Sequence, residues 1–482
     1  MTVSLSAFQN SGAQGGFGIG SQNDIAELSK ALEAGYQIGS GRTGGSALRV
    51  ESLEASLKVL THTSSHIKFW RKIPKSPAYS TVEEYNQLQS YGSPQSPFVR
   101  EGELPQENSS NYIRKMQLVK YLGEVRSVTH QASLVHPAHG NLIALENQSG
   151  ILNLLQNIER NLFIGDSSLA FSGEAEQWDG LDALIDPSMV MDLAGGTLQE
   201  ADLEEAANAV IEAYGFPTDI FLSNRASSDF QKTFYSRERV GLPAPINGQV
   251  GQSISSMLTQ SGVVEFNPDV FIRPNPSPSA LTTSANAPAA PASITAAAAA
   301  GTDGDHNKGA PAGSSSFAYV VTAANRFGES APTAVMGSVV TLSQADKDNG
   351  VHVPLTITNP TIGAFPPEYF RIYRSRAVAS TTVPTDMSQY SLVAQVPAAS
   401  QTSGGTTTFN DVNTTLPFTS TAYLGELTPS VLTFRQLMPL MRMDLAVLGP
   451  AYRWMILLYG TPILFAPRKW IRLTNIGQLS VR

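Results

Sequence analysis

The sequence predicts an α+β fold with a second, all-β part inserted into it. Residues 274–316 form a tract rich in proline, alanine, serine, threonine and glycine, a composition that does not build a packed core. Helix-type and strand-type segments alternate before this tract, whereas strand-type segments follow it to about Glu426. The remaining residues are too few to fold alone. They include WMILLYGTPILFAPRKWIRLTNIG, a run of buried strands that needs partners from earlier in the chain.

Bulk composition excludes several classes of protein. The net charge of −8 argues against wholesale wrapping of nucleic acid. The absence of cysteine excludes disulfides, thiolate metal sites and a cysteine nucleophile. No signal-peptide pattern opens the chain. The longest apolar run, residues 454–467, is too short to span a bilayer. These features predict a soluble protein of a cytoplasm-like compartment, without membrane association.

The N-terminal part predicts two projecting features. Residues 1–50 are rich in glycine, serine, glutamine and asparagine and predict an extended arm with one helix at Asp24–Ala34. IKFWRKI, from Ile67, predicts a strand. NYIRKMQLVKYLGEVRSVTHQASLV, residues 111–135, predicts a second long strand with a bulge at Gly123. The two strands, joined by a polar tip, form a projecting hairpin. Such a hairpin buries little against its own body, so we expect it to pack on another molecule.

The clearest helix covers NLIALENQSGILNLLQNIERNLFIG, with Gly150 as a weak point and Gly165 as its stop. Its apolar residues share one stripe at helical spacing: Leu142, Leu145, Leu152, Leu155, Ile158 and Leu162.

A second helix follows the first. Thr197 and Glu200 predict its capping box, and Gly215 with Pro217 ends it. DIFLSN, residues 219–224, predicts a short buried strand. Asn224 is then expected to cap a third helix over residues 225–235.

Residues 317–425 predict a β-sandwich. Phe317, Tyr319, Val321 and Ala323 alternate onto one face before a turn at residues 326–329. Further strands are expected in EYFRIYRSR (368–376), YSLVAQV (390–396) and TTTFNDV (406–412). YVVTAANRFGES resembles a strand-and-turn signature of fibronectin type III and related immunoglobulin-like modules. The segment has no tryptophan or cysteine, so the core tryptophan and bridge of true immunoglobulin domains are absent.

Charge is distributed unevenly along the chain. Twelve acidic residues and no lysine or arginine lie between Asp166 and Glu212, whereas the predicted hairpin region is basic. One interpretation is two solvated faces. The other is that the basic arm of one copy lies on the acidic body of the next. The candidate contacts pair Lys68, Arg71, Lys72, Arg114, Lys115, Lys120 and Arg126 with Asp179, Asp182, Glu200, Asp202, Glu204 and Glu205.

Motifs that could carry chemistry are incomplete. GSGRTG (39–44) lacks a preceding strand, and residues 303–307 begin like a calcium loop in which Lys308 replaces the glycine. His130, His136 and His139 lack the spacing of a metal site. The carboxylates Glu174, Glu176, Asp179 and Asp182 are the basis of an alternative hypothesis, a hydrolase with an acid/base pair. We predict no enzyme, with no catalytic, cofactor or metal site.

The order of these parts resembles the major capsid protein of tailed bacteriophages, with the Hong Kong 97-type fold. The likeness is carried by GGSALRVESLEASLKVLT (44–61) leading into FWRKIP, NIERNLFIGD at the end of the long helix, WDGLDALI (178–185), TLQEADLEEAANAVIEAYGFPTDIFLSN (197–224) and LYGTPILFAPRKWIRLTN (458–475).

The resemblance implies a domain order. It consists of an N-terminal arm (1–65), an extended loop or β-hairpin (66–132), a peripheral domain with the spine helix (133–179), an axial domain (180–273), a linker with the inserted sandwich (274–426), a continued axial domain (427–450) and closing strands of the peripheral domain (451–482).

The resemblance also implies a structural function. Hexamers and pentamers would form an icosahedral head shell enclosing double-stranded DNA without sequence-specific binding, with the insert displayed outside. Implied partners are a portal, a separate scaffolding protein and a decoration or cement protein, with assembly in the host cytoplasm and a final place in the virion. The alternative is a tail-associated or adhesion protein whose sandwich is the binding module.

Overall fold

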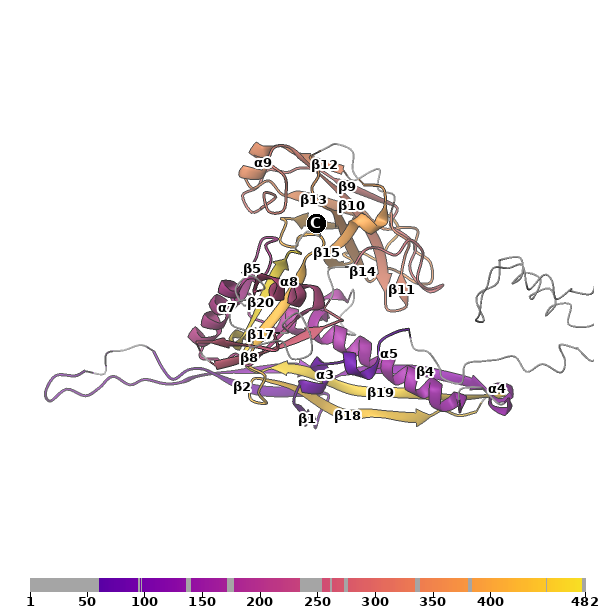
Figure 1. Ribbon diagram of the computed structural model, residues 1–482, viewed down its shortest axis with the longest axis horizontal. Coiled ribbons are helices and arrows are strands. Elements are labelled where there is room, and N and C mark those ends of the chain that lie inside the picture. Colours follow the sequence, from indigo (N-terminus) through magenta and orange to yellow (C-terminus); the bar gives the residue numbers. More distant parts are fainter. Residues whose placement is uncertain are drawn as a thin grey trace, which may run out of the picture. The chain divides into compact units, whose positions relative to one another are not determined.

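The computed structural model describes residues 60–93, 96, 98–135, 140–170, 177–234, 254–260, 262–272, 276–333, 339–379, 384–447 and 449–478 (Figure 1). The chain divides into two units, residues 1–60 with 135–142 and residues 61–134 with 143–482. Most of the first unit, including the predicted arm and its helix at Asp24–Ala34, lies outside the described residues.

A six-stranded mixed sheet forms one half of the body. Its strand order is β5-β20-β17-β6-β8-β7, with bounds β5 Val190–Asp192, β6 Asp219–Ser223, β7 Ser256–Thr259, β8 Gly262–Asp269, β17 Ser420–Gly425 and β20 Trp470–Ile476. Helices α7 (Glu200–Glu212) and α8 (Asn224–Phe234) pack on this sheet. Leu203 of α7 is buried, and Phe230 of α8 stacks on Phe266 of β8 at 5.3 Å between ring centroids.

Aromatic residues join this sheet to the rest of the body. Phe221 and Tyr423 are register partners on β6 and β17. Their rings lie 6.0 and 5.3 Å from that of Phe163 on α5, between centroids. Phe69 of the short helix α3 (Phe69–Lys72) contacts both Phe163 and Phe221, at 4.8 and 4.7 Å. These fully buried rings hold α3 and the long helix against the sheet.

Gly425 is required by close packing within this sheet. It is the register partner of Trp470, and a Cβ at this position would lie 2.5 Å from Cγ and 2.8 Å from Cε2 of the indole. The Trp470 ring is fully buried and its Nε1 donates to the Glu426 carbonyl oxygen at 3.1 Å. The rigid ring therefore has no room to move away.

We expect Gly425→Ala to lower the free energy of unfolding by about 1–3 kcal/mol, the usual cost of overpacking a core. Gly363→Ala is the matched control, because nothing lies within 4 Å of its added Cβ. Chemical denaturation of both variants measures the difference. Equal stabilities would contradict the packing argument.

A four-stranded sheet with the long helix α5 (Leu142–Ile164) forms the other half of the body. Its order is β1-β18-β19-β4, with bounds β1 Lys75–Pro77, β4 Lys120–Thr129, β18 Leu432–Asp444 and β19 Ala451–Leu464. Figure 1 shows α5 lying along β4 and β19. At Gly150, which is buried, a Cβ would lie 2.7 Å from Ile456 Cδ1 and 3.2 Å from Arg126 Cγ. The predicted weak point is thus a close approach of helix and sheet.

Strands β2 (Val82–Ser90) and β3 (Asn111–Leu118) form an antiparallel hairpin. Among the described strands they pair with each other alone. We call β2, β3 and the residues between them the limb. A single two-stranded hairpin is at best marginally stable in water, so the limb requires packing partners.

The segment between β8 and β17 folds into two facing sheets. One joins β11, β10, β14 and β15 in that order, with β12 also on β10, and the other has the order β16-β13-β9. The bounds are β9 Ser293–Ala296, β10 Ser315–Asn325, β11 Gly328–Glu329, β12 Val339–Leu342, β13 Val353–Thr358, β14 Tyr369–Ser375, β15 Tyr390–Pro397 and β16 Thr406–Asp411, with the short helix α9 at Gln344–Asp348.

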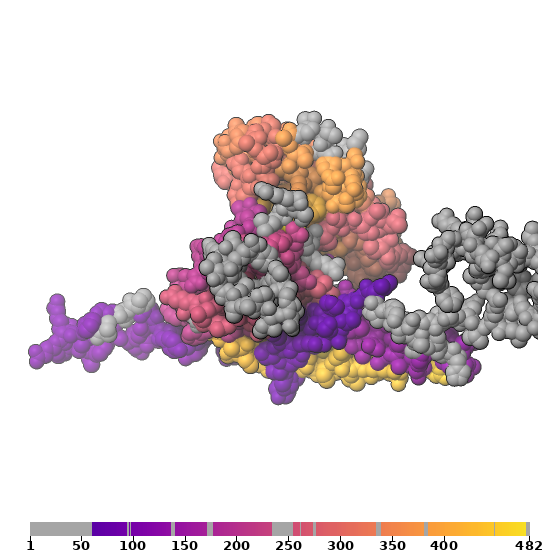
Figure 2. Space-filling model, viewed as in Figure 1, coloured from indigo at the N-terminus to yellow at the C-terminus, as the bar shows by residue number. Residues whose placement is uncertain are grey.

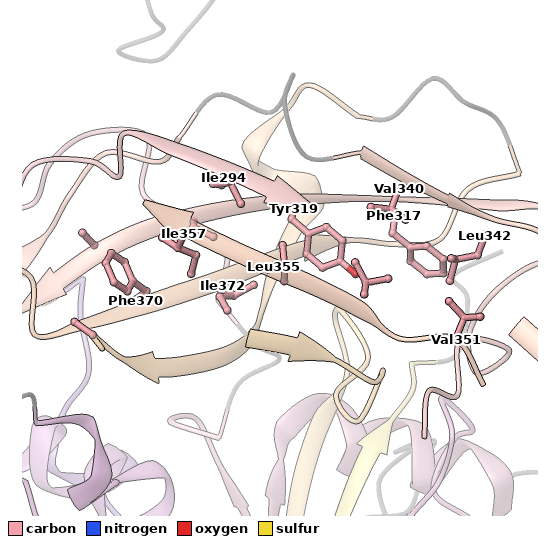
Figure 3. Packing of buried hydrophobic residues seen from close by; sticks show 14 residues of the cluster. Ile294, Phe317, Tyr319, Val340, Leu342, Val351, Leu355, Ile357, Phe370 and Ile372 are labelled. Atoms are coloured by element: carbon pink, nitrogen blue, oxygen red, sulfur yellow. The ribbon is translucent and has the colours of Figure 1, made fainter. Parts of the chain in front are cut away.

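Both sheets of this insert contribute to one core (Figure 3). Phe317, Tyr319, Val321 and Ala323 all lie in it, so the predicted alternation is confirmed. The expected strands at 368–376, 390–396 and 406–412 are confirmed as β14, β15 and β16.

Direct contacts fasten the insert to the six-stranded sheet. The Asn475 side chain on β20 accepts from the Leu416 backbone N–H at 2.8 Å and donates to the Thr414 carbonyl oxygen at 2.9 Å. Lys308 of the insert pairs with Asp192 of β5 at 3.0 Å. Asn475 has φ +55°, a conformation that asparagine tolerates better than most residues. These bonds fix the junction at two places on the insert.

Two local predictions near the limb are wrong. Residues 69–72 within IKFWRKI form helix α3, because the Glu159 carboxylate accepts the backbone N–H groups of residues 68–70. Gly123 forms no bulge and pairs in register with Leu457. The long strand is instead interrupted at Val119, whose buried backbone N–H bonds the Thr81 carbonyl oxygen.

Helices α5, α7 and α8 and strand β6 are confirmed, but two caps differ from expectation. The α7 box uses Gln199 and Asp202, whose carboxylate accepts from the Gln199 backbone N–H at 2.8 Å. Thr197 instead accepts from the Gln199 side chain. Asn224 is the first residue of α8, and the Ser223 hydroxyl accepts from the Ala226 N–H.

Strand pairing corrects the expected grouping of the closing segments. Residues 420–425 were grouped with the insert, yet β17 lies between β20 and β6 in the body sheet. Residues 432–444 were grouped with 180–273, yet β18 pairs with β19 and β1. The expected grouping places β20 in one domain with β19, within residues 451–482, yet β20 pairs with β17 and β5 in the six-stranded sheet. Long-range hydrogen bonding, which is not visible in local composition, determines these memberships.

The tract at 274–316 also differs from expectation over its described residues, 276–316. It supplies strand β9, and Ile294 enters the insert core. His306 is fully buried and contacts the Phe317 ring edge-on at 5.2 Å between centroids. Small residues allow this tract to pack closely across the sandwich, although they supply little core of their own.

Candidate assembly surfaces

The limb has two unlike faces because side chains alternate along a strand. Register partners Leu88 with Tyr112 and Glu84 with Met116 lie on one face, which we call the outer face. Tyr112 and Met116 are 67% and 70% exposed. Large apolar side chains grouped on an exposed strand surface indicate an interaction site. Figure 2 shows this part of the chain in indigo.

The opposite face of the limb contacts its own chain near its base. Tyr85 packs edge-on against Phe465 at 5.1 Å between centroids, and Gln87 Nε2 donates to the Phe465 carbonyl oxygen at 2.6 Å. Lys115 is the register partner of Tyr85 and shares this face. The Ser188 backbone N–H and hydroxyl lower the pKa of Asp186, with smaller contributions from Arg468 and Lys115. The inner face is therefore partly used inside the subunit.

A second apolar surface lies on the four-stranded sheet. Helix α5 covers one face, where Arg126 and Glu124 of β4 bond Glu146 and Asn153 of the helix. The other face, which we call the open face, carries exposed apolar side chains from two strands: Tyr121 and Val125 on β4, and Met441 and Met443 on β18. Methionine adapts its shape to a partner, which suits such a surface to binding.

Several of the basic candidate residues already have partners within the subunit. Lys72 pairs with Asp219 and Glu265 at 2.9 and 2.8 Å. Arg126 pairs with Glu124 and Glu146 at 2.5 and 3.4 Å. The remaining basic candidates differ in exposure: Lys68 and Lys120 are half-buried, whereas Arg71, Arg114 and Lys115 are exposed. The Arg114 guanidinium lies 3.3 Å from the Glu84 carboxylate across the outer face.

The acidic candidates divide in the same way. Asp179 accepts from the Ser167 backbone N–H at 2.9 Å. Asp182 accepts from the Tyr423 hydroxyl at 2.9 Å and pairs with Arg472 at 3.0 Å. Others lie along helix α7, where Asp202 caps the helix, Glu204 accepts from the Gln260 N–H at 3.3 Å, and Glu200 and Glu205 are exposed. The ion pairs of Lys72, Arg114 and Arg126 are made with acidic residues outside the candidate acidic set, and Asp182 pairs with Arg472, outside the candidate basic set.

The alternative hydrolase hypothesis finds its carboxylates in structural contacts. Asp179 and Asp182 hold backbone and side-chain partners as described above, while Glu174 and Glu176 lie outside the described residues, as do His136 and His139. Within the described ranges, no cluster of three or more histidine, cysteine, aspartate or glutamate side chains could hold a metal ion. In the described part of the chain, no helix is long and apolar enough to cross a membrane.

Sequence reasoning missed two groups of polar residues. Glu159 lies on the buried side of α5 beside Ile158, where a carboxylate was not expected. The sequence gives only a weak sign of this buried carboxylate, which is a single glutamate beside the apolar stripe of α5. The contacts of Asn475 and Lys308 depend on residues distant in sequence, so no local pattern could have found them.

A family model and curated relatives both match this chain as a major capsid protein sequence. The family model described as the SU10 major capsid protein matches residues 38–289. The putative major capsid protein of Enterococcus phage phiEF24C is 29% identical over 460 residues, covering 94% of this chain and 95% of that protein. The major capsid protein of Staphylococcus phage S25-3 is 28% identical over 467 residues, covering 95% and 96%.

Solved structures give weaker likenesses. A chain from Gordonia phage Cozz has a TM-score of 0.45 at 11% identity, covering 93% of this chain and 97% of that chain. The encapsulin complex from Synechococcus elongatus PCC 7942 has a TM-score of 0.39 at 11% identity, covering 89% and 95%. The family model, by contrast, spans more than half of the sequence. This chain therefore belongs to the SU10 major capsid protein family.

Proposed function

We propose that this chain is the major capsid protein of a tailed bacteriophage, self-assembling into the icosahedral head shell around double-stranded DNA. The limb carries the proposal, because its outer face exposes Tyr112 and Met116 and its two strands lack further strand partners in the described chain. An element with so little burial is ordered best by other subunits, which couples its order to assembly. Family membership supports the same function.

The proposal assigns a role to each part within a Hong Kong 97-type fold. The limb is the extended loop and α5 is the spine helix. The six-stranded sheet is the axial domain, and the four-stranded sheet is the peripheral domain. The insert is an immunoglobulin-like sandwich displayed outside the shell.

Subunits associate as hexamers and pentamers in this proposal. A scaffolding protein, a portal and a decoration protein are the expected partners, and assembly takes place in the host cytoplasm before the protein becomes part of the virion. Contact with DNA is not sequence-specific. The acidic net charge of −8 is consistent with an enclosing wall that does not bind DNA tightly.

We expect Tyr112→Ser with Met116→Ser to abolish shell assembly while the subunit stays folded. Each exposed side chain contributes about 1.5–3 kcal/mol when fully buried in a contact, and the contact recurs in every subunit. Negative-stain microscopy of the expressed chain, with and without a candidate scaffolding protein, measures the yield of closed particles. Thermal denaturation checks the fold.

Leu281→Ser is the control, since Leu281 is also highly exposed but lies in the insert. Its particle yield should match that of the original sequence. Normal shells from the double limb variant would refute the role of the limb. Small rings or trimers from the unaltered chain would favour the tail-associated or adhesion alternative.

The charge component is tested by two neighbouring residues on opposite faces of β3. Arg114 lies on the outer face, whereas Lys115 shares the inner face with Tyr85. Arg114→Gln should lower particle yield and weaken its dependence on salt, because charged patches orient association and are screened by ions. Lys115→Gln should change both less. Equal effects of the two substitutions would contradict a contact between the outer face of one limb and the body of the next subunit.

A further inference from the structure

Two buried carboxyl groups meet where three segments of the body join. Glu159 lies on α5 and Asp269 is the last residue of β8, and neither side chain has exposed surface. The third segment, residues 68–70, begins helix α3 and leads toward the limb. A charged carboxylate is expensive to bury, and two adjacent ones are still more so.

Three of the four carboxyl oxygen atoms in this pair accept hydrogen bonds from backbone N–H groups. Glu159 Oε1 accepts from the backbone N–H groups of Lys68 and Phe69 at 2.7 and 2.6 Å, and Oε2 accepts from Trp70 at 2.7 Å. Asp269 Oδ1 accepts from the Phe271 N–H at 2.7 Å. Among the described residues, the buried Oδ2 of Asp269 has no hydrogen-bond donor, although Asp269 lies within hydrogen-bonding reach of the Glu159 carboxyl group.

We propose that Glu159 and Asp269 share one proton, which fastens residues 68–70 to helix α5 and makes this joint sensitive to pH. With one proton, the pair carries a single negative charge that four backbone N–H donors stabilise. Without it, two buried carboxylates repel each other. The least costly relief is for residues 68–70 and the end of β8 to separate from the helix.

Neighbouring charges do not remove this dependence. Lys68 acts on Asp269 and Lys75 lies near Glu159, so both favour ionised carboxylates. Burial outweighs them: it raises the pKa of Asp269, and with Asp269 as neighbour it raises the pKa of Glu159 to about 8. The other charged or titratable groups on the packed elements are engaged elsewhere: Lys72 with Asp219 and Glu265, and His62 with Phe271 and the Leu152 carbonyl oxygen.

The direction of the pH effect follows from proton binding. Between the ordinary pKa of a glutamate and about 8, the folded pair holds a proton that the unfolded chain has released. Stability therefore falls as pH rises through this range, and the contribution of the shared proton is lost above it. The joint is expected to be closed at pH 6.5 and loosened at pH 9.5.

Hydrogen–deuterium exchange on the full chain tests the proposal, with protection corrected for the intrinsic pH dependence of exchange. Between pH 6.5 and 9.5 we expect protection of the amides of residues 68–73 to fall at least tenfold. Glu159→Gln should remove this fall, because its amide nitrogen can donate to Asp269 and its carbonyl oxygen still accepts from Lys68 and Phe69, while the Trp70 N–H loses its acceptor. Unchanged protection in the original sequence, or an equal fall in the variant, would overturn the proposal.

Two further variants make the test specific. Asp269→Asn replaces the other carboxyl with a neutral group of the same shape, and it should also flatten the pH response, even if Glu159→Gln is poorly folded. Glu146→Gln makes the same change elsewhere on α5, at a partly exposed carboxylate paired with Arg126. This control should keep the full pH response. Loss of the response in the control as well would show that the pair is not its source.

Discussion

Deletion of residues 276–426 is expected to leave this protein unfolded, whereas deletion of residues 276–414 should leave the body folded. The two deletions differ by strand β17, Ser420–Gly425, which follows the insert in sequence but belongs to the body. It lies between β20 and β6, at one of the two central positions of the six-stranded sheet.

The size of the expected effect follows from what β17 contributes. Ala422, Tyr423 and Leu424 are each at most 1% exposed, and the strand forms ladders with neighbours on both sides. Burial of each large side chain contributes about 1.5–3 kcal/mol. The lost ladders add unpaired backbone groups on β6 and β20. Together these losses are comparable to the whole stability of a domain, about 5–15 kcal/mol.

Circular dichroism, size-exclusion chromatography and thermal denaturation can compare the two deletions, each closed with the same glycine–serine linker. The shorter deletion should give a cooperative transition. The longer one should give aggregates or a chain without a transition. A folded product of the longer deletion would show that β17 is dispensable, and an unfolded product of the shorter one would show that the body depends on the insert.

The error at β17 illustrates what the sequence could and could not predict. Helix α5, helix α7 and the strands of the insert were found because apolar residues repeat at 3.6 or 2 positions. STAYLG at 420–425 has the same local appearance as the preceding insert strands. Its membership is decided by partners about two hundred residues earlier and fifty later, on β6 and β20.

For the candidate assembly surfaces, too, the sequence shows one property and hides another. Charge asymmetry along the chain was evident, but the sequence could not tell which charges are used within one subunit. The charge pattern groups Lys72 and Arg126 with Arg114, yet the first two have acidic partners in the body, whereas Arg114 pairs with Glu84 on the outer face of the limb. Polar groups such as Glu159 escape pattern analysis, because their partners are backbone N–H groups of a segment distant in sequence.

Arg374→Met is expected to destabilise the insert strongly, because it leaves a buried carboxylate without its cation. Arg374 is 1% exposed and its guanidinium donates to Asp411 at 2.5 Å, to Asn413 and to the Thr415 carbonyl oxygen at 3.1 Å. Asp411 also accepts from the Tyr319 hydroxyl at 2.8 Å. Removing one partner of a buried ion pair costs about 3–5 kcal/mol.

The pH dependence of the variant separates this mechanism from lost packing. Burial acts to raise the pKa of Asp411, but the Arg374 guanidinium and the Asn413 N–H outweigh it and lower this pKa. The stability that this lowered pKa contributes is present above the ordinary pKa of an aspartate. It is lost as the pH falls through the lowered pKa of Asp411 in the folded protein. In Arg374→Met the pKa of Asp411 should instead be raised. Protonation can then relieve the buried charge, so the loss should be larger at pH 8 than at pH 5.

Calorimetry of the full chain at both pH values can measure the loss, with Arg376→Met as the control at an exposed arginine of the same insert. The control should change stability by no more than about 0.5 kcal/mol. Adding Asp411→Asn to Arg374→Met should recover part of the loss at pH 8, because the uncompensated charge is gone. If the double variant is no more stable than the single one, the cost arises from the missing side-chain volume, and Asp411 does not require a cation.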